Sequence, residues 1–247
     1  MILDGHIHVG EWQYEHYPVR CDVSAVNRLL DECGIDGAIL MPTDRKDNEA
    51  TLEDIRRNGR KRYWFFAWMD PRNPDALPFV RANRGEVAGL KFHSGLDRVE
   101  GGVAHPLYEP FLQYAAAEGL PVLVHCGRWQ EMSSYKYALE AARRYPEVRF
   151  ILAHLGGDFE KLKLEAPRDL KAMGLRNVVF DISATREFWT IEMAIREAGA
   201  DQFVFASDYP VMHPKMSLAS VEVLNLTDAE RRKLYWENLL RVLEPAR

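Results

Sequence analysis

The sequence contains eight apolar segments of strand length, and each ends at a polar or turn-forming group. Their starting points lie about 29 residues apart on average, which is the length of one strand, one helix and two short loops. Segments such as 150–153 are continuously apolar, as expected of parallel strands that are covered on both faces. Between the segments, apolar residues recur at helical spacing, as in 26–33. The eight segments are residues 2–9, 37–41, 64–69, 87–93, 121–125, 149–154, 178–183 and 203–207.

Eight strand–helix units in 247 residues predict one α/β domain, a single (β/α)8 barrel spanning residues 1–247, since such barrels have about 250 residues. A doubly wound sheet would have fewer strands, and the sequence VGEW at 9–12 lacks the glycine-rich turn of its nucleotide-binding form. No linker or low-complexity segment divides the chain. We expect the last helix to begin at the N-cap Thr227, to run through Glu230 to Leu243, and to pack on the outside of the barrel.

Charge and cysteine content exclude several classes of protein. The chain has 32 Lys and Arg against 37 Asp and Glu, a net charge of −5, without the basic patch that a nucleic-acid surface needs. Cys21, Cys33 and Cys126 are not spaced as in a disulfide framework or a zinc ribbon. No apolar stretch reaches 18 residues. We therefore expect a cytoplasmic protein that acts on a small molecule and binds neither nucleic acid nor a membrane.

Histidines are concentrated at the ends of the predicted strands. Residues two apart on a strand share a face, so His6 and His8 point the same way. The carboxyl ends of barrel strands form one rim, where the active site of such a barrel is built. A single histidine at a strand end is usually an ordinary hydrogen-bonding residue, but five of the chain's eight histidines are expected at this rim. The polar groups at the strand ends are His6, His8, Lys91, His93, His125, His154 and Asp208.

This set of groups indicates a metal site. Three histidines and one aspartate with an open coordination position are typical of a catalytic divalent ion, which lowers the pKa of a bound water towards neutrality. Zn²⁺ fits such ligands best, with Mn²⁺, Fe²⁺ and Co²⁺ as alternatives, because ligand geometry selects a class of metal better than one metal.

Six motifs, in their order along residues 4–243, resemble those of the metal-dependent amidohydrolase superfamily. The match is to its branch of small barrels known as amidohydrolase 2, which includes decarboxylases and lactonases. Each motif alone is weak, whereas the ordered set is specific. The motifs are DGHIH (4–8), GLKFH (89–93), PVLVHCG (121–127), AHLGG (153–157), ASDYP (206–210) and ENLLRVL (237–243).

The resemblance implies roles for the rim residues. His154 and Asp208 would move protons, and the family also suggests a homodimer. Lys91 matches the position at which binuclear members of the superfamily carry a carboxylated lysine that bridges two metal ions. The resemblance to this branch implies that the lysine faces a substrate carboxylate without bridging metal ions, so we expect one metal ion rather than two. The implied metal ligands are His6, His8, His125 and Asp208.

Four further residues are candidates for binding an anionic substrate: Lys91, His93, Arg128 and Arg186. Arg128 and Arg186 lie just after two of the strands, where a guanidinium could pair with a carboxylate, and a solvated loop charge is an equally good interpretation of each. Asp181, inside the segment 178–183, is either an ordinary hydrogen-bonding residue of the rim or a partner that hydrogen-bonds a metal ligand, and we favour the second interpretation.

Three functions are consistent with these residues. The leading hypothesis is a metal-dependent hydrolase that uses activated water on an amide, ester or lactone. The first alternative is a metal-dependent, non-oxidative decarboxylase of an unsaturated or aromatic carboxylic acid. The second alternative is a metal-binding barrel without catalytic activity.

Overall fold

The eight predicted strands form one curled sheet in the computed structural model, which describes residues 1–12 and 19–244. The order β2-β1-β3-β4-β5-β6-β7-β8-β9 follows the chain, and all neighbouring pairs except β1–β2 are parallel. The short β2 was not predicted. The strands are β1 (Leu3–Glu11), β2 (Arg20–Cys21), β3 (Gly37–Pro42), β4 (Arg62–Trp68), β5 (Val87–Phe92), β6 (Val122–Val124), β7 (Phe150–Leu152), β8 (Val178–Asp181) and β9 (Phe203–Val204).

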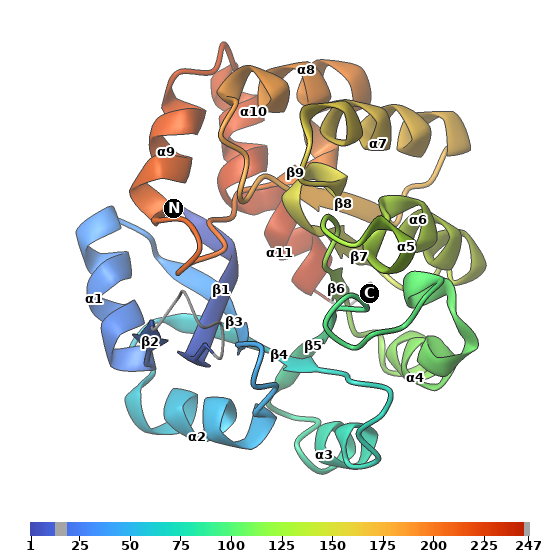
Figure 1. Ribbon diagram of the computed structural model, residues 1–247. Helices are drawn as coiled ribbons and strands as arrows, with labels where there is room; N and C mark the ends of the chain where they lie inside the picture. The colour runs from blue at the N-terminus through green and yellow to red at the C-terminus, as the bar shows by residue number, and fades with distance from the viewer. Residues whose placement is uncertain (13–18, 245–247) are drawn as a thin grey trace.

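Helices follow the parallel strands, and Figure 1 shows α1 to α9 arranged around the sheet. They cover the outward face of the strands and bury the larger apolar cluster of the protein between themselves and the sheet. Within residues 1–12 and 19–244, no helix combines the length and the apolarity needed to span a membrane. The helices are α1 (Val23–Cys33), α2 (Asn48–Asn58), α3 (Ala76–Ala82), α4 (Glu109–Glu118), α5 (Gln130–Ser133), α6 (Tyr135–Arg144), α7 (Glu160–Met173), α8 (Phe188–Ala198), α9 (Pro214–Glu222), α10 (Asp228–Arg232) and α11 (Asn238–Leu243).

The two edges of the curled sheet meet in an irregular seam rather than in a regular ladder. Among the described residues β9 pairs with β8 alone, so the predicted closed barrel is confirmed only as a curled sheet of eight parallel strands. Beyond the end of β9 the chain reaches β1 through an isolated bridge between Ile7 and Tyr209. Three backbone hydrogen bonds cross the seam: Gly5 N to Phe205 O (2.9 Å), Asp208 N to His6 O (2.8 Å) and His8 N to Tyr209 O (2.8 Å).

The buried carboxylate of Asp4 reinforces this seam. Its Oδ1 accepts hydrogen bonds of 3.0 Å from the backbone N–H of His6, on its own strand, and of Ser207, on the other side. The pairing register of β1 shifts between Asp4 and Ile7, so the strand bulges at this point. Burial raises the pKa of Asp4 to about 7, against the opposing effect of these hydrogen bonds.

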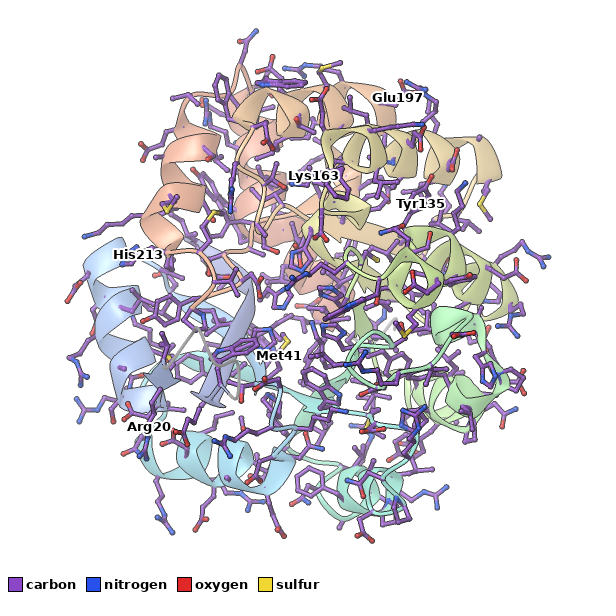
Figure 2. The ribbon with its side chains drawn as sticks, viewed as in Figure 1. Arg20, Met41, Tyr135, Lys163, Glu197 and His213 are labelled. Carbon is purple, nitrogen blue, oxygen red and sulfur yellow. The ribbon has the colours of Figure 1, made fainter. Side chains whose placement is uncertain are left out.

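The C-terminal helix packs outside the sheet only in part, which corrects the prediction made from its pattern: Leu234 and Tyr235 pack with the larger apolar cluster, whereas α11 packs inside the sheet. The predicted cap is present, since Thr227 and Glu230 form a reciprocal capping box at the start of α10. The helix then continues through a π-helical turn (Lys233–Glu237) into α11. Leu239 and Val242 of α11 are buried in the smaller apolar cluster with inward-facing strand residues such as Met41. α11 lies near the centre of the ring of helices in Figure 1, and Met41 is labelled near the centre of Figure 2.

This placement predicts a large cost for truncating Leu239. Leu239→Ala should lower the free energy of unfolding by about 2–5 kcal/mol, because it opens a cavity inside the curled sheet where little can collapse into it. Urea unfolding measures the loss. Val223→Ala removes a side chain that is 62% exposed and serves as the control, with an expected change below about 0.5 kcal/mol. Equal losses in the two variants would contradict the interior position of α11.

The raised pKa of Asp4 predicts a pH-dependent stability. The folded-state pKa of about 7 lies above the unfolded value of about 3.9, so the stabilising contribution of Asp4 is complete below pH ~4 and is lost as the pH rises towards ~7. Asp4→Asn mimics the neutral acid and keeps an acceptor for both N–H groups. The unfolding free energy of Asp4→Asn relative to wild type should therefore grow by about 3 kcal/mol between pH 5 and pH 8, measured in metal-free buffer. A difference that is the same at both pH values would contradict this.

Candidate metal centre

Three buried ligand atoms converge where β1 meets the segment after β9. His6 Nε2 and His8 Nε2 are 3.2 Å apart, and each lies 3.3 Å from Asp208 Oδ1. Around a tetrahedral ion with bonds of about 2.0–2.1 Å, neighbouring ligand atoms are about 3.3–3.4 Å apart. The triangle thus has the dimensions of one face of a zinc coordination sphere.

Hydrogen bonds on the far side of each ring fix which nitrogen faces this triangle. His6 Nδ1 lies 2.9 Å from Asp181 Oδ2, and His8 Nδ1 lies 2.7 Å from the carbonyl oxygen of Pro42. Both partners accept, so Nδ1 carries the proton in each neutral ring and Nε2 presents a lone pair. Two lone pairs and a carboxylate oxygen repel one another unless a positive group lies among them. The residues therefore fit a divalent cation, and the partners of Nδ1 orient the rings as in known metal sites.

Sharp turns place two of the site residues. Asp208 and His154 both adopt left-handed backbone conformations, with φ of 62° and 60°. Asp208 lies four residues beyond the end of β9, and His154 lies two residues beyond the end of β7. Residues other than glycine rarely adopt this conformation, and such strain is concentrated at functional sites. The Asp208 backbone is held by the seam hydrogen bond to His6, and the His154 N–H donates to Asp181 Oδ1 at 2.9 Å.

A chain of hydrogen bonds leads away from the triangle through His154. The Ser183 hydroxyl donates to Asp181 Oδ1, so its oxygen accepts from His154 Nδ1 at 2.8 Å. With both rings neutral, His154 Nε2 then accepts from His125 Nδ1 at 3.2 Å. This leaves His125 Nε2 as a lone pair that is buried and without a hydrogen-bond partner in the described part of the chain. An unpartnered buried acceptor is costly unless something else binds it.

The protonation states suit cation binding. Burial lowers the pKa of His6 and His125 well below the ordinary histidine range, and the nearby Lys91 ammonium lowers the pKa of His6 further. Burial acts to raise the pKa of Asp208, but the surrounding imidazoles, His6 foremost, outweigh it and lower that pKa to about 2. Neutral imidazoles and an ionised carboxylate are the forms that bind metal.

The structure brings together part of the predicted set. His6, His8 and Asp208 have ligand atoms within 4.8 Å of one another, and a second such group consists of His6, His154 and Asp181. The carboxylate oxygens of Asp181 accept hydrogen bonds from His6, His154 and Ser183, which explains that second group without an ion. His125 belongs to neither group and reaches the site through His154.

The predicted substrate-binding residues lie in two different environments. Lys91 is fully buried, with Nζ 3.2 Å from His6 Nε2, and burial lowers its pKa to about 8. His93 is also buried, and its ring stacks on that of His125. Arg128 is exposed and lies over the Trp129 ring, 5.4 Å from its centroid. Arg186 is exposed as well.

Two residues of the site were assigned no role from the sequence. Ser183 follows Asp181 by two residues, the spacing that puts both side chains on one face of a strand, and this spacing could have revealed it. Asp4 precedes His6 by two residues in the same way, but its bond to Ser207 joins residues 203 positions apart and has no local signal.

Comparison with known proteins relates the chain to one protein family. A family model described as amidohydrolase matches residues 4–244. A comparison with curated protein sequences gives no match. Solved structures match nearly the whole chain. Their sequence identities to this chain are low, so these matches establish its fold and nothing beyond it.

Three solved structures are representative of these matches. A zinc-bound amidohydrolase from Burkholderia multivorans is 18% identical with a TM-score of 0.78, and the match covers 98% of this chain and 99% of that one. A Pseudomonas putida protein assigned as a 2-pyrone-4,6-dicarboxylic acid hydrolase is 15% identical with a TM-score of 0.76, covering 98% and 97%. The 5-carboxyvanillate decarboxylase from Sphingomonas paucimobilis is 13% identical with a TM-score of 0.73, covering 99% of each chain.

Metal titration tests the centre directly. Metal-free protein should bind one Zn²⁺ per chain, and His8→Ala should weaken binding by at least about 100-fold, since loss of an outer partner alone costs 10–100-fold. His213→Ala is the matched control, because its ring accepts a hydrogen bond at the start of α9 and belongs to neither candidate metal group. Competition with a chromophoric chelator gives the affinities. Unchanged binding by His8→Ala would contradict the assignment.

Proposed function

Because the chain belongs to the amidohydrolase family, we propose that it is a metal-dependent hydrolase that adds water to an amide, ester or lactone carbonyl. The observation that carries this proposal is the triangle of His6 Nε2, His8 Nε2 and Asp208 Oδ1, with the His154 ring stacked 5.5 Å from that of His6. The site would lie on the rim of a (β/α)8 barrel made by the single domain.

In this proposal one divalent ion, Zn²⁺ by preference, is held by four residues. A zinc-bound relative and the 3.2–3.3 Å triangle support this choice. The unpartnered Nε2 of His125 supports its inclusion as the fourth ligand. When bound, such an ion lowers the pKa of water and polarises a carbonyl. The occupied oxygens of Asp181 favour one ion over two. The ligands would be His6, His8, His125 and Asp208.

His154 is the proposed general base. In the neutral ring, the proton lies on Nδ1 and is donated to Ser183, so Nε2 carries the lone pair. This lone pair accepts the His125 Nδ1–H in the structure, and it would exchange that hydrogen bond for the proton of the reacting water. Asp181 would stabilise the imidazolium that forms, because its Oδ1 accepts the Ser183 hydroxyl. Asp208 is the second proposed proton carrier: it would receive that proton from His154 and pass it to the leaving group as the bond from the leaving group to the carbonyl carbon breaks. A base that begins unprotonated suits the addition of water.

We propose that the substrate is a small anion. The buried ammonium of Lys91 and the exposed guanidinium groups of Arg128 and Arg186 supply positive charge on or near the rim. A guanidinium fork matches the two oxygens of a carboxylate, which supports the arginines as the outer binding groups. His93, the fourth predicted substrate-binding residue, has another interpretation that is argued below.

Decarboxylation of an aromatic carboxylic acid is the second candidate. The structural relatives include the 5-carboxyvanillate decarboxylase and a 2,6-dihydroxybenzoate decarboxylase, the latter complexed with 2,6-dihydroxybenzoate. That reaction needs an acid that protonates carbon as CO2 leaves, so His154 would have to begin as the imidazolium. The two candidates therefore differ in the resting state of one ring.

Product analysis separates the candidates. The zinc-loaded protein is incubated in H2¹⁸O with a panel of lactones, amides and aromatic acids. Hydrolysis predicts an acid product carrying ¹⁸O, whereas CO2 release without ¹⁸O in the organic product would establish decarboxylation instead.

Removing the proposed base tests the role of His154. His154→Gln should lower kcat by about 10²–10⁴-fold with Zn²⁺ binding unchanged. The substitution removes proton transfer, leaves the triangle intact and keeps an amide oxygen that can accept the His125 Nδ1–H. His105→Gln, which alters a ring that caps a surface turn, is the control. Full activity in His154→Gln would refute the base assignment, and no activity on any substrate by zinc-loaded wild type would favour a non-catalytic metal-binding barrel.

A further inference from the structure

Three aromatic rings from neighbouring strands form a stack beside the candidate metal centre. The His93 ring lies 3.8 Å from the His125 ring, centroid to centroid, at an angle of 10° between the planes. It lies 5.5 Å from the Trp68 ring at an angle of 13°. Trp68 ends β4, His93 follows β5 and His125 follows β6, and β5 pairs with both neighbours. The His93 ring therefore lies between the other two.

The far end of the stack is fixed by a buried carboxylate. The Trp68 indole Nε1–H donates to Asp97 Oδ1 at 3.2 Å, and the Tyr108 hydroxyl donates to Asp97 Oδ2 at 2.7 Å. Lys46 Nζ lies 2.8 Å from Asp97 Oδ1 and also pairs with Asp70 at 2.6 Å. Asp97 is 1% exposed, so its charge depends on these donors.

The His93 ring is held by contacts at one edge and on both faces. Its Nδ1 accepts the backbone N–H of Leu96 at 3.3 Å, and its two neighbours in the stack take up the ring planes. The side chain is 7% exposed. These contacts fix the plane of the His93 ring.

We propose that His93 is a positioning residue, a plate that fixes the ring plane of His125, and that Trp68 and the Lys46–Asp97 ion pair hold this plate. Stacking sets the plane of His125, while the hydrogen bond from its Nδ1 to His154 sets the rotation of the ring within that plane. Together they aim the unpartnered Nε2 of His125. The support runs from a surface loop through three strands to the site.

Two substitutions of His93 distinguish a positioning role from a contact with substrate. His93→Phe keeps a flat ring and removes both nitrogens, whereas His93→Ala removes the ring. The first readout is the imidazole Nδ1–H resonance of His125 in metal-free protein, which the hydrogen bond to His154 protects from exchange with water. The second readout is Zn²⁺ affinity, and this arm alone rests on the proposed function.

A positioning role predicts different results for the two variants. His93→Phe should keep the resonance and bind Zn²⁺ within about threefold of wild type, and His93→Ala should lose the resonance and about 10-fold or more in affinity. Both variants losing kcat/KM equally, with resonance and affinity unchanged, would overturn the proposal in favour of a substrate contact. If wild type binds no Zn²⁺, the proposed function is wrong, but the His125 resonance still tests the positioning role of His93. Retention of the resonance in wild type, His93→Phe and His93→Ala would overturn that role.

The ion pair at the far end provides a test that does not touch the site. Lys46→Met removes the cation from buried Asp97 and should broaden the His125 resonance and weaken Zn²⁺ binding several-fold, whereas Lys46→Arg should restore both. Lys61→Met is the matched control, because Lys61 pairs with Asp31 at 2.7 Å with a similarly covered side chain. Lys46 is partly exposed, so this arm remains informative if His93→Ala does not fold. Identical behaviour of Lys46→Met and Lys61→Met would overturn the role of the ion pair.

Discussion

The seam between β1 and the segment after β9 is the constraint on which the rest of the structure depends. A curled sheet that stops short of closure has two exposed edges, and exposed edges present unpaired backbone groups. Here the edges are joined by a few backbone hydrogen bonds and by the Asp4 carboxylate, which accepts an N–H from each side. Two of the candidate metal ligands, His6 and Asp208, lie on opposite sides of this seam. The contacts that join the two edges therefore also bring these two ligands together.

Burial and neighbouring groups together decide the charge of each group at the seam. Leu239 of α11 fills the interior below the site, so water is excluded beneath these groups. Desolvation disfavours the charged form of every one of them, which raises the pKa of Asp4 to about 7 and lowers that of His6. The pKa of Asp208 is lowered instead, because the surrounding imidazoles outweigh the effect of burial. A single environment thus gives a carboxyl group that favours its proton beside one that remains ionised.

The repeating features of the fold could be predicted from the sequence. Eight apolar segments at even intervals specify the strands, and the two-residue spacing of His6 and His8 specifies a shared face. The sequence does not specify which distant residues pack together. The helical pattern around Leu239 indicates that this residue is buried, but not that it packs against the inward-facing strand residues. The seam depends on residues about 200 positions apart, and Trp68 is a core aromatic by pattern, so neither the bulge nor the ring stack has a local signature.

The two sides of the rim use different chemistry, and electrostatics gives a reason. The side made by β1, β8 and the segment after β9 carries Asp4, Asp181 and Asp208, all buried, with the Lys91 ammonium beside them. Another buried carboxylate would add a desolvation cost of several kcal/mol that this one lysine could not offset. Imidazoles supply lone pairs without charge, and their flat faces pack like core residues, so β5 and β6 can extend the site with the stacked rings of His93 and His125. The hydrogen bond between His125 and His154 joins the two sides, and it requires only neutral rings.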